Sequence, residues 1–136
     1  LISTAVSQLP RPGLYKFMEV CADCAKRKVI YSAAEPELCR KILQLLVSEN
    51  EMPDWAADMD IITWPERKHH GRKDLRYVQT DWLNGVIVDD LEQYIHPMQF
   101  ECWIPIENFD GRNTQDNELM RVAEQIKLKA FGTERV

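Results

Sequence analysis

Residues 29–48, VIYSAAEPELCRKILQLLVS, predict a short strand followed directly by an amphipathic helix. The segment 29–31 consists of strand formers. Pro36 suits the first turn of a helix, where its missing N–H costs nothing, and Glu35 and Glu37 suit the positive end of the helix dipole. The apolar side chains of the helix over 36–48 recur every three or four residues and predict one buried face, formed by Leu38, Ile42, Leu45 and Leu46.

Another strand is predicted upstream, over residues 14–20, where strand formers show some alternation with other residues. The polar segment 21–28 connects it to the strand at 29–32, so the two strands predict an antiparallel β-hairpin with a long loop. Residues 1–12 are predicted to be an irregular arm, because Pro10 and Pro12 interrupt any helix there.

The remaining elements are short strands and one long helix. We expect strands at 61–64 and 100–106, the second at a sheet edge because it contains Pro105. Thr114 is suited to cap a helix over 114–131, because its side-chain oxygen can accept a backbone N–H.

The stretch 75–95 is compatible with two structures. Asn84-Gly85 is a hairpin-turn dipeptide between the strand candidates 77–83 and 86–88, after which a helix over 89–96 would end at Pro97. A single helix is the alternative, because apolar residues recur there every four positions, and we favour the strands. Together these elements predict one α+β domain over residues 1–136, with a small mixed or antiparallel sheet and two to three packed helices.

The composition is that of an ordinary globular protein. The chain has 136 residues, of which 17 are Lys or Arg and 22 are Asp or Glu, so its net charge is −5. This acidic balance disfavours a general DNA-coating protein but leaves room for a local basic site. No apolar stretch approaches the roughly 20 residues that span a bilayer. Four cysteines are too few for a disulfide scaffold and no signal peptide precedes residue 10, so we expect a cytoplasmic protein.

The cysteines offer a candidate zinc site. Cys21 and Cys24 form a Cys-x-x-Cys pair, and Cys39 or Cys102 would have to help complete four ligands. A second Cys-x-x-Cys pair is missing, so we predict no structural zinc. The pair is also placed between two predicted strands rather than at a helix N-terminus, which disfavours a thioredoxin-like redox role.

A basic segment at 66–76 is a candidate nucleic-acid-binding loop. Its cations could neutralise phosphates, with Trp64 and Tyr77 able to stack on bases. The alternative, which we favour slightly, is that the loop pairs with the acidic run at 49–60. The phosphate-binding candidates in this loop are Arg67, Lys68, Arg72 and Lys73.

The opening of the chain resembles the GIY-YIG nuclease family. Residues 12–17, PGLYKF, and 29–33, VIYSA, followed by a helix, are similar to its two tyrosine-bearing strands and catalytic helix. The resemblance implies a nuclease dependent on Mg²⁺ or Mn²⁺. Lysine replaces the family's arginine, position 45 is leucine and position 33 is alanine, which implies weakened or lost cleavage. The resemblance places Tyr15, Tyr31, Lys41 and Glu92 in the catalytic positions, Glu92 as the metal ligand by chain order alone.

Two functions therefore compete. The first, which we favour, is a small regulatory protein without enzymatic activity or cofactor, which binds a larger protein through an acidic surface with exposed aromatics. Four tryptophans support it, because exposed tryptophan is enriched at interfaces: Trp55, Trp64, Trp82 and Trp103. The alternative is a divergent GIY-YIG-type nuclease or nucleic-acid-binding domain.

Overall fold

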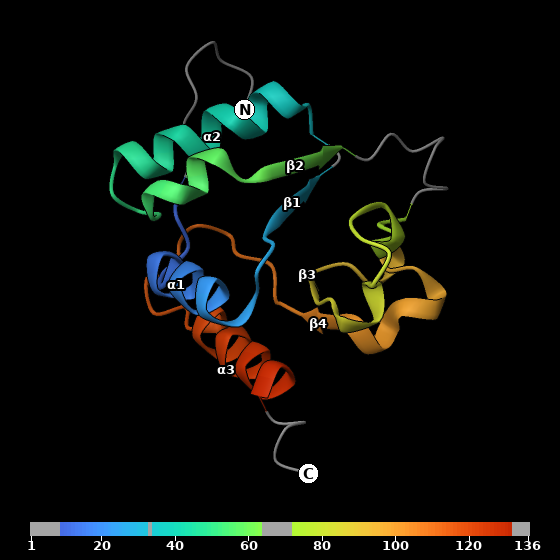
Figure 1. The fold of residues 1–136 in the computed structure, drawn as a ribbon. Coiled ribbons are helices and arrows are strands. Elements are labelled where there is room, and N and C mark those ends of the chain that lie inside the picture. The colour runs from blue at the N-terminus through green and yellow to red at the C-terminus, as the bar shows by residue number, and fades with distance from the viewer. Residues whose placement is uncertain (1–8, 33, 64–71, 132–136) are drawn as a thin grey trace.

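The computed structural model describes residues 9–32, 34–63 and 72–131. Three α-helices and two separate two-stranded parallel sheets form the main elements (Figure 1). The α+β class predicted from the sequence is confirmed. Single turns of 3₁₀-helix connect several of the elements. The bounds are α1 Leu14–Cys24, β1 Val29–Ser32, α2 Pro36–Ser48, β2 Asp60–Thr63, β3 Ile87–Asp89, β4 Trp103–Pro105 and α3 Glu118–Phe131.

The predicted strand at 14–20 is wrong, because these residues belong to helix α1. Gly13 precedes the helix with a φ of 85°, a left-handed conformation that suits glycine. Leu14, Phe17, Met18 and Cys21 recur at helical spacing, and all four pack into hydrophobic cores. The partial alternation in the sequence resembled a strand, but the buried face follows the helical period. The antiparallel hairpin between 14–20 and 29–32 therefore does not form.

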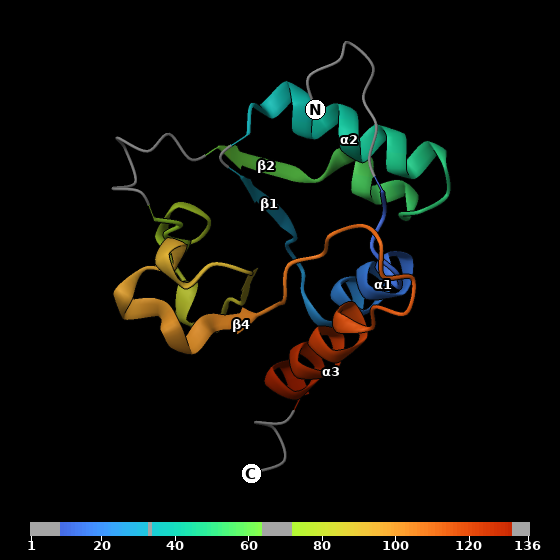
Figure 2. The same ribbon diagram turned by 180° about the vertical axis from the view of Figure 1, so that it is seen from behind.

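Strand β1 is confirmed at Val29–Ser32, but it pairs with β2 in parallel, with Ile30 opposite Ile61. Helix α2 lies between β1 and β2 in the sequence and packs on β2, so this part forms a β-α-β unit (Figure 2). Because parallel strands need a crossover connection, α2 fixes the direction in which β2 runs.

The predicted helix over 36–48 is confirmed, with Pro36 in its first turn. Its buried face is displaced by one residue from the predicted one, because Cys39, Leu43 and Leu46 are the buried side chains. Leu43 is 4% exposed and packs with Met18 of α1 and Met59 before β2. Ile42 is only half-buried at the edge of this core.

The region 75–102 differs most from its prediction. The expected strand at 77–83 and helix at 89–96 are absent, and separate 3₁₀ turns replace them at Leu75–Tyr77, Trp82–Asn84 and Glu92–Tyr94. A further 3₁₀ segment, Pro97–Cys102, leads into β4. The alternative of a single helix, based on apolar side chains every four residues, is also wrong, because buried Leu75, Ile87 and Ile95 come from different elements and form one small core.

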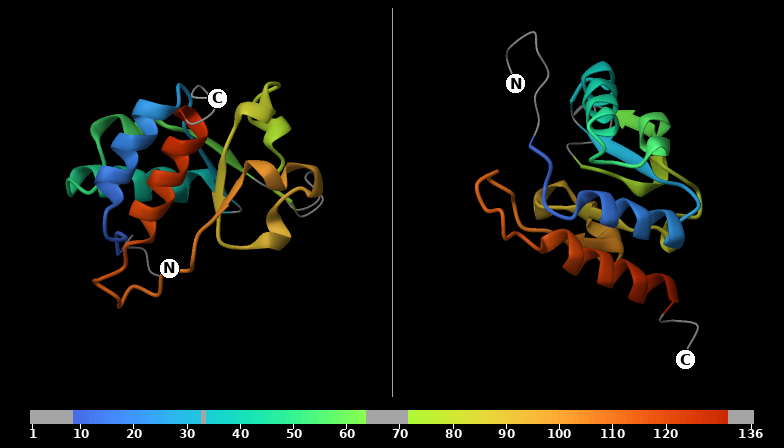
Figure 3. Two further views of the ribbon diagram at one scale, coloured as in Figure 1. Left: turned by 90° about the horizontal axis from the view of Figure 1, so that it is seen from below. Right: turned by 90° about the vertical axis from the view of Figure 1, so that its left-hand side faces the viewer.

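Strands β3 and β4 form the other sheet, with Val88 opposite Ile104. Pro105 is the last residue of β4. Among the described strands β4 pairs with β3 alone, so it lies at a sheet edge, as predicted from Pro105. Helix α3 begins at Glu118 rather than at 114, and it packs beside α1 (Figure 3). Within the described ranges, no helix is long and apolar enough to cross a membrane.

Arg11 connects the start of α1 to the segment before α3. Its Nε and Nη2 atoms donate to the two carboxylate oxygens of Asp116, both at 2.9 Å. This hydrogen-bonded pairing lowers the pKa of Asp116. The guanidinium also lies over the ring of Phe109, 5.3 Å from its centroid. A two-pronged contact of this kind fixes both position and orientation, so it joins segments that are far apart in the sequence.

Candidate functional site

Polar residues stand at the carboxyl ends of β1 and β3. Ser32 is the last residue of β1, and Asp89 is the last residue of β3, followed by Asp90. In open parallel sheets, ligands bind outside the carboxyl ends of the strands. These ends are therefore the first place to look for a site.

A part-buried ion pair lies at the carboxyl end of β3. Lys73 Nζ lies 2.5 Å from Asp89 Oδ2, and the two side chains are 15% and 4% exposed. The other carboxylate oxygen of Asp89 accepts the backbone N–H of Leu91 at 3.0 Å. The backbone N–H of Lys73 donates to the carbonyl oxygen of Tyr94 at 2.7 Å. Both charged groups are thus held in place, which is what a preorganised site needs.

Tyr31 connects the end of β1 to the same segment. Its hydroxyl oxygen accepts the backbone N–H of Asp74 at 3.1 Å and donates to the carbonyl oxygen of Asp74 at 3.3 Å. Burial raises the pKa of Tyr31 to about 12, so the hydroxyl keeps its proton at neutral pH. Residues 73–74 therefore lie between the carboxyl ends of β1 and β3.

Asp74 is buried and strongly hydrogen-bonded. Burial alone would raise its pKa, but hydrogen bonds from the side chain and backbone of Arg76 and from the amide of Gln99 lower the pKa well below its usual range. Arg76 Nη2 lies 2.6 Å from Asp74 Oδ2, and Gln99 Nε2 donates to Asp74 Oδ1 at 2.8 Å. Asp74 is thus a fixed carboxylate that holds the segment 73–76 in position.

We group the polar residues at these two strand ends with Lys73 and call them the strand-end site: Ser32, Lys73, Asp89 and Asp90. Ser32 Oγ accepts the backbone N–H of Ala34 at 3.0 Å, which leaves its own hydroxyl proton for another acceptor. Asp90 is exposed to solvent. A hydroxyl donor and an ammonium group together match the acceptor oxygens of an anion such as phosphate.

The four residues predicted as catalytic lie on separate elements. Tyr15 is exposed on α1, Lys41 is exposed on α2, and Glu92 is exposed in a 3₁₀ turn, while Tyr31 is half-buried on β1. Of these four, Tyr31 alone belongs to the contacts around the strand-end site, through Asp74.

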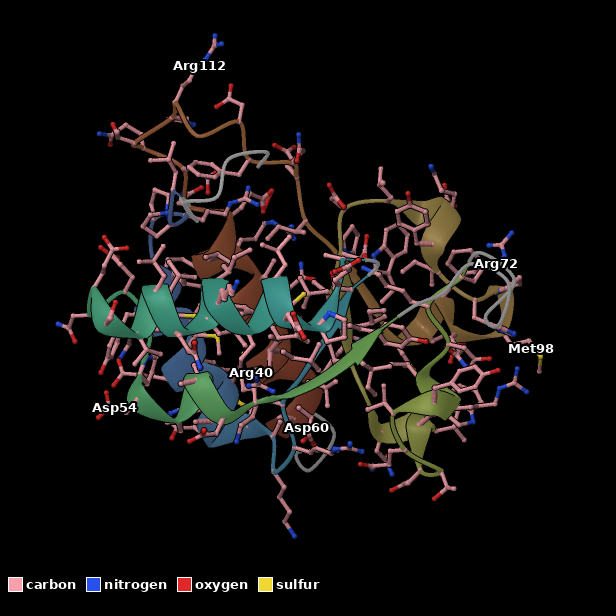
Figure 4. All side chains as sticks on the ribbon, turned by 90° about the horizontal axis from the view of Figure 1, so that it is seen from above. Arg40, Asp54, Asp60, Arg72, Met98 and Arg112 are labelled. Atoms are coloured by element: carbon pink, nitrogen blue, oxygen red, sulfur yellow. The ribbon has the colours of Figure 1, made fainter. Side chains whose placement is uncertain are left out.

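The predicted nucleic-acid-binding residues are only partly described, because Arg67 and Lys68 lie outside the described residues. Arg72 Nη1 donates to the carbonyl oxygens of Ile95 at 2.9 Å and Gln93 at 3.2 Å. Figure 4 shows Arg72 on the opposite side of the molecule from Asp54, with Asp60 between them. The slightly favoured pairing of this loop with the acidic run at 49–60 is therefore wrong for Arg72, and nucleic-acid binding stays a prediction.

The cysteines are distributed over three elements. Cys21 and Cys24 lie on α1, in a helix rather than in a loop between strands, and they pack against the core under α3. Burial raises the pKa of Cys21 to about 11. Cys39 and Cys102 are buried elsewhere. Among the described residues no three metal-ligating side chains converge, and the absence of structural zinc stays a prediction.

Sequence reasoning missed Ser32, Asp89 and Asp90 as site residues. Each follows an apolar strand segment, 29–31 or 86–88, and this pattern could have identified them. It was missed because the parallel pairs β1–β2 and β3–β4 were not predicted, and because contacts of residues 73 and 74 link the carboxyl ends of β1 and β3.

A family model matches almost the whole chain. The family model described as NLI interacting factor-like phosphatase covers residues 2–135. No curated protein and no solved structure matches the chain.

This match overturns the earlier functional predictions. The resemblance of residues 12–46 to GIY-YIG nucleases was wrong, which agrees with the helical structure of 14–24. The prediction of a regulatory protein without enzymatic activity is also wrong, because the matching family is one of phosphatases. The chain belongs to the family of NLI interacting factor-like phosphatases.

Proposed function

We propose that the strand-end site binds the phosphoryl group of a phosphate monoester and that the chain serves in its hydrolysis. The observation that carries this proposal is the ion pair between Lys73 and the buried Asp89 at the carboxyl end of β3, beside the segment that contacts β1. Family membership supports the reaction class. A lysine held by a buried carboxylate is a fixed positive charge, which suits a doubly charged phosphate.

Each residue has a distinct role in this proposal. Lys73 compensates charge on the phosphoryl oxygens, and Asp89 holds the ammonium group in position. Ser32 donates its hydroxyl proton to a phosphoryl oxygen. Phosphoryl transfer depends mainly on positioning and electrostatic stabilisation, so fixed donors contribute most of what a protein can supply.

The carboxylates of Asp89 and Asp90 also fit a divalent cation. Mg²⁺ usually binds proteins through one or two carboxylates and completes its coordination with water and substrate phosphate. When bound, Mg²⁺ would supply further positive charge to the phosphoryl group. The sequence analysis expected no cofactor for the favoured function. The proposal made here includes a divalent cation instead.

A cytoplasmic location remains part of the proposal. It rests on the cysteines, which are all unpaired.

We expect Ser32→Ala to lower kcat/KM for p-nitrophenyl phosphate by about 10–100-fold. The reason is the loss of one hydrogen bond to a charged group, worth about 1.5–3 kcal/mol. Ser48→Ala is the matched control, because Ser48 is an exposed serine at the end of α2 whose hydroxyl donates only to Leu45 within the same helix. Equal rates for the two folded variants, with Mg²⁺ present, would remove Ser32 from the site.

A further inference from the structure

Trp103, the first residue of β4, reaches the carboxyl end of β3 with its side chain. Its indole Nε1 donates to the backbone carbonyl oxygen of Asp89 at 2.9 Å. The same oxygen accepts the backbone N–H of Ile106 at 3.2 Å, so both of its lone pairs are occupied. A side chain from outside the strand-end site therefore contacts one of the site residues through the main chain.

The carbonyl group of Asp89 stands where β3 ends. The chain leaves the sheet at the next residue, which forms a bend. Without the indole, this last carbonyl would be held by a single hydrogen bond at the end of a two-stranded sheet, and the ends of elements open more easily than their middles. The carboxylate of Asp89 can keep its direction toward Lys73 only while its own main chain stays in place.

Packing fixes the indole ring itself. The ring packs against the small core that contains Ile87 and Ile95. The ring of Phe100 also lies against it, with 6.0 Å between the ring centroids and a tilt of 54°. Because neighbours on these two sides limit the rotation of the ring, the N–H group is held toward one acceptor.

The segment before Trp103 is also joined to the lysine side of the ion pair. Gln99, in the 3₁₀ segment that leads into β4, is 2% exposed. Its side chain accepts the backbone N–H of Leu75 at 2.9 Å and donates to the carboxylate of Asp74 at 2.8 Å. These two residues directly follow Lys73. One short segment thus holds the lysine side of the ion pair through Gln99 and the carboxylate side through Trp103.

We propose that Trp103 is a positioning residue of the strand-end site, which acts by fixing the main chain of Asp89. This role rests on the proposed function, because it affects phosphate binding only if the site binds phosphate. Tryptophan suits it, since the indole combines a large apolar ring with one N–H donor and has no acceptor. Groups that orient the ligands of a metal ion typically contribute about 10–100-fold to metal affinity or activity.

The binding test compares the 136-residue chain with Trp103→Phe, which keeps an aromatic ring and removes the N–H donor. Inorganic phosphate is titrated in the presence of Mg²⁺, and the NMR signal of the Asp90 amide gives the dissociation constant. Trp103→Phe should raise this constant about tenfold. Trp82→Phe is the matched control, because Trp82 packs against the same core from a 3₁₀ turn, and it should change the constant by less than about twofold.

A second measurement needs no ligand. The amides of Leu91 and Ile106 both donate to Asp89, so Trp103→Phe should speed their hydrogen exchange about 2–10-fold, the effect of one neutral hydrogen bond. Amides in the middle of α2 are the internal control and should not change. If the exchange at α2 rises as much as at Leu91 and Ile106, the role of Trp103 is merely structural and the proposal is wrong.

Other outcomes would also overturn the proposal. These are an unchanged dissociation constant in folded Trp103→Phe, an equal rise in Trp82→Phe, or unchanged exchange at both amides. If Trp103→Phe does not fold, the unmodified chain decides: saturating phosphate should shift the indole N–H signal of Trp103 but not that of Trp82, and no shift at Trp103 contradicts the role. Absence of phosphate binding by the unmodified chain would instead contradict the proposed function, and the exchange measurement would then decide whether Trp103 fixes Asp89.

Discussion

Replacing Lys73 with methionine should destabilise the protein by about 3–5 kcal/mol, because it leaves the buried carboxylate of Asp89 without its partner. Methionine keeps the length and apolar stem of lysine, so the loss reports mainly on the charge. The free energy of unfolding, measured by urea denaturation, gives the value.

Lys127→Met is the matched control for this substitution. Lys127 forms an ion pair with Glu124 on α3 at 3.2 Å, but the two side chains are 46% and 66% exposed, so the loss should be within about 0.5 kcal/mol. Adding Asp89→Asn to Lys73→Met should recover stability, because the neutral amide can still accept from Leu91 without a buried charge. A loss of less than about 0.5 kcal/mol for Lys73→Met would show that the pair is not buried.

Leu43→Ala should cost about 2–5 kcal/mol, because the side chain is 4% exposed and its removal leaves a cavity between α2 and the residues before β2. Ile42→Ala should cost clearly less, since Ile42 is only half-buried. Gln44→Ala, at an exposed position of the same helix, should change stability by no more than about 0.5 kcal/mol. Thermal or urea unfolding of the three variants ranks their losses of stability. If Ile42→Ala lowered the free energy of unfolding more than Leu43→Ala, the buried face would be the one predicted from the sequence.

Local signals explain which elements could be predicted. Strand β1 and helix α2 carry their own determinants, a run of strand formers and a Pro36-led amphipathic helix, and both were correctly predicted. Helix α1 was missed because the apolar residues of its sequence fit both the strand period and the helical period. The helical period corresponds to the buried face, where Phe17 packs against residues far along the chain. The turns of 75–102 depend on contacts such as Gln99 with Asp74, 25 residues apart, which no local pattern encodes.

The residues of the candidate site could be identified only once the fold was known. Lys73 was predicted as a phosphate contact for its place in a basic run, whereas its defining partner is Asp89, 16 residues away. Tyr31 was chosen through a wrong resemblance, although it does lie beside the site. Ser32 and Asp90 become site candidates only in the folded chain, where contacts of residues 73 and 74 with Tyr31 and Asp89 link the carboxyl ends of β1 and β3.

The most direct test of the central claim is a titration of the protein with inorganic phosphate in the presence of Mg²⁺. Binding is monitored through the NMR chemical shifts of the backbone amides. Saturable shifts should concentrate at Ser32, Lys73, Asp89 and Asp90, and Ser32→Ala should weaken the binding while Ser48→Ala leaves it unchanged. Lys26, between α1 and β1, and Lys129, in α3, serve as internal references. Saturable shifts centred on those lysines, or none at the strand ends, would contradict a phosphate site at the carboxyl ends of β1 and β3.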